Sequence, residues 1–331
     1  MAENKKGTIL SGMRPTGKLH LGHLIGVLKN WRELQEEYNC IYEIVDWHAL
    51  TTKYDQTEDI NQSIKDIAID WISAGVDPEE SIIFVQSDVP EIAELHLLLS
   101  MIVSVGRLER IPTYKEQIEE LGKEDAIPFG LLEYPILQAA DILAFKGEVV
   151  PVGEDQIPHI ELSREIARRF NRLYKEVFPE PEAKLSKVPR LPGLDGRKMS
   201  KSSGNAIFLA DEEEEIKDKV NQLVTDPERV RLDDPGHPEV CSVYDFHEIF
   251  NREETQEIAK NCRSAELGCV DCKQRLADNI LEETAKIRQR RKELVANPEE
   301  IEEILAEGAK KARKIAKRTL AEVKQAMNLR K

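Results

Sequence analysis

The sequence predicts an α/β protein, with a doubly wound parallel sheet over residues 1–205 and a helical domain over residues 206–331. Two observations carry this prediction. Up to residue 205, short apolar runs of strand length alternate with longer segments of helical apolar spacing, which is the pattern of βαβ units. Beyond that point the strand pattern stops, and segments rich in Glu and Lys with helical spacing follow. At 331 residues the chain has room for both domains.

The elements follow in chain order. Residues 7–12 form a short apolar strand that runs into a loop containing Gly and Pro, and a helix is expected from Leu19 to Tyr38, where apolar side chains share one face. Further buried strands are expected at residues 41–45, 81–86 and 149–152, with helices at residues 60–74 and 91–105. Open parallel sheets bind ligands outside the carboxyl ends of their strands, so we expect the functional site there.

Composition narrows the class of protein. Hydrophobic residues make up 40% of the chain, which permits a sizeable core. No uncharged apolar run reaches the length of a membrane span and the first residues lack a signal-peptide core, so we expect a soluble cytoplasmic protein without a membrane partner. The net charge of −15 argues against a protein that coats nucleic acid over its whole surface.

Basic residues gather at the C-terminal end. Residues 305–331 contain nine Lys or Arg residues against two acidic residues. Such a helix could hold a polyanion against one face, or it could simply be a solvated amphipathic helix, and charge alone leaves both readings open.

The first candidate motif is His20-Leu21-Gly22-His23, which follows the loop Ser11–Gly17. A glycine-containing loop that leads into a helix offers backbone N–H groups and a positive dipole end to an anion. Two histidines three residues apart on a helix share a face and could both donate to phosphate oxygens. Taken alone, such a pair is more often a metal pair or part of a helix surface than a phosphate site.

The second motif is Lys198-Met199-Ser200-Lys201-Ser202, in a stretch that also contains Gly193, Gly196 and Gly204. Two lysines on a loop expected to be mobile can close over a triphosphate and follow the negative charge onto a leaving pyrophosphate.

A polar face on an apolar segment marks a third site. Tyr134, Gln138 and Asp141 are spaced i, i+4 and i+7, so they share one face of a helix. Buried polar groups need partners, which here are a bound small molecule or structural hydrogen bonds. The segment Pro151–Gln156 follows at a strand-to-helix transition.

Four of the five cysteines lie within 32 residues: Cys241, Cys262, Cys269 and Cys272. Four thiolates suit zinc or an iron–sulfur cluster. Their spacing contains a single Cys-x-x-Cys pair, so it leaves the metal open.

Together, these motifs resemble the tryptophanyl-tRNA synthetases, a family of class I aminoacyl-tRNA synthetases, over nearly the whole chain. The resemblance is also carried by Ser11–Gly17, Asp46–Thr51 and Thr225–Arg231. It implies a Rossmann-like catalytic domain over residues 1–205, and over residues 206–331 an anticodon-binding domain with the four-cysteine site and the basic C-terminal helix. It also implies activation of L-tryptophan by ATP with Mg²⁺, transfer to the cognate tRNA, and a homodimer. Many bacterial members replace both histidines of the first motif; this chain keeps them.

The resemblance also assigns residues. It makes His20, His23, Lys198 and Lys201 catalytic. It places at ATP the residues Arg14, Pro15, Thr16, Gly22 (beside the adenine), His23, Gly153, Glu154, Asp155, Leu191, Lys198, Met199, Ser200, Lys201 and Ser202. It places at tryptophan the residues Asp141, which would accept the indole N–H, Gln138, Tyr134, Gln156 and His48. The four cysteines resemble the ligands of a [4Fe-4S] cluster in a bacterial subgroup, with Zn²⁺ as the alternative.

Three other functions remain to be weighed. A tyrosyl-tRNA synthetase shares the fold, and Gln138 is compatible with it. A catalytically silent RNA-binding paralogue should have lost His23 or Lys201, and both are present. A small nucleotidyltransferase with a His-x-Gly-His loop would lack the helical domain and the lysine–serine loop.

Overall fold

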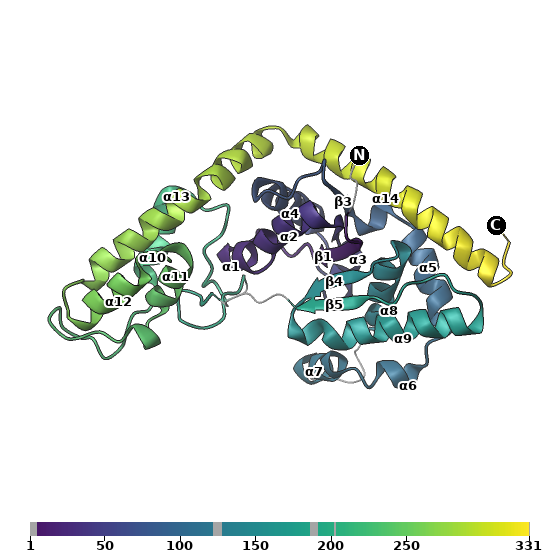
Figure 1. Ribbon diagram of the computed structural model, residues 1–331, viewed down its shortest axis with the longest axis horizontal. Coiled ribbons are helices and arrows are strands. Elements are labelled where there is room, and N and C mark those ends of the chain that lie inside the picture. Colours follow the sequence, from purple (N-terminus) through teal and green to yellow (C-terminus); the bar gives the residue numbers. More distant parts are fainter. Residues whose placement is uncertain (1–4, 122–127, 186–190, 202, 331) are drawn as a thin grey trace.

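The computed structural model describes residues 5–121, 128–185, 191–201 and 203–330. It consists of a lobe built on a sheet and a smaller helical lobe. Two long C-terminal helices connect the two lobes (Figure 1). Among the described residues, no helix is both long and apolar enough to cross a membrane.

The sheet has five parallel strands in the order β3-β2-β1-β4-β5. Its strands are β1 (Thr8–Met13), β2 (Asn39–Ile44), β3 (Ser81–Val85), β4 (Val149–Val152) and β5 (Glu182–Leu185). The first four confirm the predicted strands. The strand order reverses direction at β1, so the carboxyl ends of β1 and β4 flank a crevice of the kind that binds nucleotides in such folds.

Helices cover both faces of the sheet, as the doubly wound fold requires. They are α1 (Leu21–His23), α2 (Lys29–Glu37), α3 (Asp46–Lys53), α4 (Ile60–Ser73), α5 (Glu91–Ser100), α6 (Val105–Leu108), α7 (Pro112–Leu121), α8 (Phe129–Ala144) and α9 (Ile157–Leu173). The expected helix over residues 19–38 is present, but residues Leu24–Leu28 adopt a π-helix between α1 and α2. The expected helix over residues 91–105 ends earlier, at Ser100.

Each face of the sheet has its own core. On one face, Tyr42 of β2 stacks on Trp31 of α2 at 4.2 Å between ring centroids, and Trp71 of α4 meets Trp31 edge-on. On the other face, Ile41 of β2 and Phe84 of β3 join a cluster with the apolar sides of α5, α8 and α9. Successive residues of a strand face opposite sides of the sheet. Ile41 therefore joins the second core, whereas Tyr42 and Ile44 join the first.

Beyond residue 206 the described residues form no β-strand, as predicted. The helices are α10 (Glu213–Gln222), α11 (Ser242–Phe250), α12 (Thr255–Arg263), α13 (Cys269–Ala296) and α14 (Pro298–Ala326). The long helical stretch breaks at Asn297, because the residue before a proline is disfavoured in a helix.

The last helix returns to the sheet lobe. Small residues of α14, among them Ala309, Ala312 and Ala316, are buried against the core on the β3 side. Helix α14 thereby covers the outer strand β3, which would otherwise be an unprotected sheet edge.

The boundary between the two predicted domains, at residue 205, stays a prediction.

Gly308 marks the closest contact of α14 with the sheet. A Cβ atom at this position would lie 1.8 Å from the backbone oxygen of Ile83. We expect Gly308→Ala to force α14 away from β3 and to lower the free energy of unfolding by about 1–3 kcal/mol or more, measured by urea unfolding. Gly130→Ala in α8 is the control, because a Cβ there meets nothing within 4 Å. Equal stabilities for the two variants would contradict this packing.

Intramolecular ion pairs account for part of the basic C-terminal helix. The guanidinium of Arg313 contacts Glu91 at 3.0 Å, and Lys324 contacts Glu94 at 2.5 Å, both on α5. Lys146 reaches Glu322 at 2.7 Å. Several of the predicted cations therefore hold α14 to the sheet lobe.

Candidate active site

One large cavity opens at the carboxyl ends of β1, β2 and β4. Its volume is about 790 Å³, within the usual size range of small-molecule sites. The predicted residues that line it are Arg14, His48, Tyr134, Gln138, Asp141, Gly153, Asp155, Gln156 and Lys198. The structure thus gathers side chains from both predicted halves of the site, the amino-acid half and the ATP half, around one space.

Asp141 is the best-buried carboxylate of the predicted set. Helix α8 carries it into the cavity with 3% of its surface exposed. One carboxylate oxygen lies 2.9 Å from Nε2 of His48, and the other accepts a hydrogen bond of 2.8 Å from Nε2 of Gln86. Gln86 is fixed in turn, because its Oε1 accepts the backbone N–H of Trp47 at 3.1 Å. Asp141 is therefore held in one orientation from two sides.

Sequence reasoning missed Gln86. The residue directly follows β3 and is fully buried. The available signal was a polar side chain at the carboxyl end of a buried parallel strand.

Tyr134 and Gln138 line the cavity on the same helix face, as predicted. The Tyr134 hydroxyl lies 2.9 Å from Oγ1 of Thr113 and 3.1 Å from Nε2 of His159. Burial lowers the pKa of His159 to about 4, so its imidazole is uncharged near neutral pH. Gln138 reaches Gln156 at 3.5 Å. Thr113 and His159 are further contacts that sequence reasoning missed.

The two histidines of the first motif have a local geometry that differs from the expected one. His20 precedes α1 in an extended conformation, so the pair does not share a helix face; instead the two rings lie 3.8 Å apart and tilted. Burial is the main cause that lowers the pKa of His20 to about 4 and that of His23 to about 3. Gly22 permits this arrangement, because a Cβ there would lie 2.9 Å from the His20 ring.

The lysine loop closes against the Gly/Pro loop. Nζ of Lys201 donates to the backbone oxygen of Gly17 at 2.7 Å and to Oγ1 of Thr16 at 3.3 Å. Burial lowers the pKa of Lys201 to about 8. Asn205 supports the loop by accepting the backbone N–H of Ser200 at 2.9 Å. The two predicted phosphate loops are therefore in direct contact.

The other predicted ATP residues are distributed as follows. Pro15, Leu191 and Met199 are buried, the last two in the apolar cluster that continues from the sheet lobe into the helical lobe. Glu154 is exposed and does not line the cavity, whereas its neighbours Gly153 and Asp155 do. Ser202 lies outside the described residues.

Buried Asp70 connects this loop with the C-terminal helices. Its carboxylate accepts the backbone N–H of Leu19 and the Nε–H of Arg291 on α13, each at 2.8 Å. Arg288, also on α13, pairs with Glu213 at 3.1 Å. Both arginines therefore join α13 to other parts of the chain.

The four cysteines surround one small cavity in the helical lobe. Cys241 precedes α11, Cys262 lies on α12, and Cys269 and Cys272 lie in the first turn of α13. Among the described residues, no three side chains of His, Cys, Asp or Glu are close enough together to hold a single metal ion.

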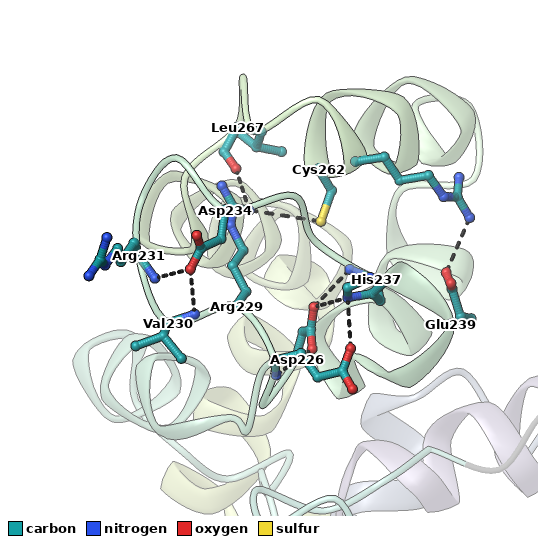
Figure 2. A network of polar contacts seen from close by, with 11 residues as sticks. Asp226, Arg229, Val230, Arg231, Asp234, His237, Glu239, Cys262 and Leu267 are labelled. Carbon is teal, nitrogen blue, oxygen red and sulfur yellow. Dashed lines mark hydrogen bonds and ion pairs between the residues drawn. The ribbon is translucent and has the colours of Figure 1, made fainter.

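Polar contacts position the wall of this cavity (Figure 2). Arg229 donates to the Leu267 carbonyl at 2.9 Å and lies 3.9 Å from Sγ of Cys262. Asp226 accepts hydrogen bonds from the backbone N–H and Nδ1 of His237. Both Asp226 and Arg229 line the cavity, so the segment Thr225–Arg231 singled out in the sequence lies against the cysteines.

In the absence of a bound cation, the surroundings of this cavity disfavour the thiolate form of the four cysteines. Burial is the main cause that raises the pKa of Cys272 to about 12, and the three other cysteines raise it further. Nε2 of the buried His247 lies 3.2 Å from its sulfur. A bound cation would reverse this balance, because metal ligation deprotonates thiols.

Comparisons with known proteins place the chain among its relatives. The family described as class I tRNA synthetases (W and Y) matches residues 2–284. The tryptophan–tRNA ligase of Thermotoga maritima is 55% identical over 97% of this chain and 99% of that protein. That of Aquifex aeolicus is 46% identical over 97% of this chain and 99% of that protein. A crystal structure of tryptophanyl-tRNA synthetase from Campylobacter jejuni, complexed with ADP and tryptophan, has a TM-score of 0.89 at 34% identity and covers 97% of this chain and 100% of that chain.

Proposed function

The chain belongs to the class I tRNA synthetases of the tryptophan and tyrosine type, as a tryptophan–tRNA ligase, and from this premise we propose which of its side chains perform the reaction. The observation that carries the assignment is the shared cavity, in which Asp141, Gln138 and Tyr134 face the same space as Arg14 and Lys198. The amino acid occupies the α8 side, and ATP occupies the side between the two phosphate loops.

Asp141 recognises the indole ring by accepting its N–H. His48 and Gln86 hold the carboxylate in place through the contacts given above, so that it is ready for the ligand before binding. Phenylalanine would leave this buried acceptor unpaired, and discrimination of this kind reaches ~10⁴ or more. Tyr134 and Gln156 orient the α-amino and α-carboxylate groups.

The ATP side supplies hydrogen bonds and positive charge. ATP enters as its magnesium complex, with Arg14, Thr16 and the glycine backbone on one side and Lys198 and Lys201 on the other. Because His20 and His23 are uncharged near neutral pH, they act on the phosphates as hydrogen-bond donors and not as cations.

The first half-reaction needs no side-chain nucleophile. A carboxylate oxygen of tryptophan attacks the α-phosphorus of ATP, and the bond to the bridging oxygen of pyrophosphate breaks, so that pyrophosphate leaves with the electron pair. The lysines stabilise the charge that develops on the pyrophosphate. In the second half-reaction a hydroxyl of the terminal tRNA ribose attacks the activated carbonyl and AMP leaves.

The experiment that tests this proposal measures both half-reactions with the wild-type chain. We expect tryptophan-dependent ATP–pyrophosphate exchange, followed by charging of tRNA with labelled tryptophan. Exchange that does not depend on an added amino acid would contradict the placement of both substrates in one cavity.

We further propose that the four cysteines hold a [4Fe-4S] cluster, with zinc as the alternative. The donor set supports this, because four thiolates are the usual ligands of both. All four thiols line one small cavity in the helical lobe, so a single group bound there could take its sulfur ligands from all of them. Its chemistry here is structural: it would join α11, α12 and the start of α13.

Iron analysis tests the cluster directly. Protein purified without oxygen should contain about four iron atoms per chain, and Cys272→Ser should lose most of them and melt at a lower temperature. Cys40→Ala is the control, because Cys40 lies in β2 far from this cavity in the fold. About one zinc per chain would favour the alternative, and protein without either metal would contradict a metal site.

We propose a homodimer that acts in the cytoplasm, with the helical lobe contacting the anticodon of the tRNA. Light scattering of the purified chain should give twice the 37.7 kDa chain mass.

A further inference from the structure

Asp70 is a buried carboxylate that the proposed reaction does not use. It lies in the last turn of α4, has none of its surface exposed and does not line the active-site cavity. A carboxylate is stable in such a place only when hydrogen bonds and an opposite charge compensate for the lost water. Here Oδ2 accepts the backbone N–H of Leu19 and Oδ1 accepts the Nε–H of Arg291, each at 2.8 Å.

The first partner belongs to the peptide that leads into the first histidine motif. Leu19 directly precedes His20 and is itself fully buried. Its carbonyl accepts the backbone N–H of Leu209 at 2.9 Å, in the segment that follows the lysine loop. The peptide before the turn His20–His23 is therefore fixed on one side by backbone and on the other side by Asp70. The bond to Asp70 is the stronger kind while the carboxylate is charged.

The second partner belongs to the helix that arrives from the helical lobe. Helix α13 begins at Cys269 in that lobe and packs against α4 of the sheet lobe (Figure 1). Arg291 lies in its last part with 13% of its side chain exposed, and its guanidinium also lies 3.8 Å from Asp66. Its positive charge compensates the buried charge of Asp70. One carboxylate thus connects α13 with the peptide before the histidine turn.

We propose that Asp70 and Arg291 are positioning residues for ATP, which together hold the turn His20–His23 in the place where it faces the phosphates. This inference rests on the proposed binding of ATP at that turn. Neither side chain lines the cavity, so each acts through the backbone of Leu19. Without Arg291 the carboxylate would turn toward water or take up a proton, and both changes weaken its bond to the Leu19 N–H. The nucleotide site therefore depends on the position of α13.

The test measures kcat/KM for ATP and KM for tryptophan in pyrophosphate exchange. In Arg291→Gln we expect kcat/KM for ATP to fall roughly 10- to 100-fold, with a change of less than about threefold in KM for tryptophan, because a small displacement of the histidine turn affects the ATP side. Arg291→Lys keeps the positive charge and should lose less. The double variant Asp70→Asn/Arg291→Gln removes both charges and retains an oxygen that accepts the Leu19 N–H, so its kcat/KM for ATP should exceed that of Arg291→Gln.

Arg288→Gln is the matched control on the same helix. Arg288 lies one turn before Arg291 and is buried to a similar degree, with 9% of its side chain exposed, but it pairs with Glu213 of α10. Both variants lose an ion pair of α13, so both should melt at a lower temperature. Arg288→Gln should change kcat/KM for ATP by less than about threefold, because its partners do not hold the histidine turn.

The outcomes separate this inference from the proposed function. A folded Arg291→Gln enzyme with wild-type kcat/KM for ATP would overturn the inference and leave the proposed function intact. Equal losses for ATP and tryptophan, or an equal loss in Arg288→Gln, would also overturn it, since they indicate a general loosening of the structure. If Arg291→Gln does not fold, Arg291→Lys and the double variant allow the same comparison. A wild-type chain without tryptophan-dependent exchange would overturn the proposed function first, and this inference with it.

Discussion

Replacing Asp141 with alanine should lower kcat/KM for tryptophan in pyrophosphate exchange on the order of 10²- to 10³-fold. The change removes the proposed acceptor of the indole N–H. It also leaves His48 and Gln86, both buried, without the carboxylate that now pairs with them. The loss should appear mainly for tryptophan, so the preference for tryptophan over phenylalanine should shrink.

Glu109→Ala provides the matched control, because it removes an exposed carboxylate in the same lobe. Thermal melting of both variants shows whether the sheet lobe remains folded. A folded Asp141→Ala enzyme with wild-type preference for tryptophan would rule out the assigned role.

Replacing Lys201 with alanine should lower kcat of the exchange by roughly 10²- to 10³-fold, because positioned charge on the leaving group is lost. In the structure its ammonium is held by Gly17 and Thr16 at the edge of the proposed triphosphate site. Its KM for tryptophan should change little, since the amino acid binds on the other side. Lys217→Ala, which removes a half-buried lysine of α10 that pairs with Glu214, should leave kcat unchanged.

The pH dependence gives Lys201 a second readout. Burial lowers its pKa to about 8, so the cationic form predominates below that pH and is lost above it. Because kcat/KM reports ionisations of the free enzyme, kcat/KM for ATP should decline as the pH rises through about 8. Lys201→Arg should abolish this decline, since arginine stays protonated. An identical decline in that variant would assign the titration to another group.

Much of the fold could be predicted because its strands are buried on both faces. The runs that became β1 to β4 are short and apolar, and turn residues or helices bound them. Strand β5 could not be found in this way, since its residues are Glu182, Ala183, Lys184 and Leu185 and most of them are exposed. Only pairing with β4 identifies it as an edge strand.

Site residues that share a helix face or a short loop could be predicted from their spacing in the sequence. Tyr134, Gln138 and Asp141 line one cavity, as their spacing indicated. Gln86 contacts Asp141 from 55 positions away in the chain; its place at a strand end could mark it as a candidate, but not show which residue it contacts.

The most direct test of the account compares tryptophan and tyrosine as substrates of the wild-type chain in parallel pyrophosphate-exchange assays. The similarity to tryptophan–tRNA ligases and the proposed tryptophan pocket predict a kcat/KM for tryptophan that clearly exceeds that for tyrosine. Comparable values for the two amino acids, or a preference for tyrosine, would contradict the central claim that this cavity selects an indole ring.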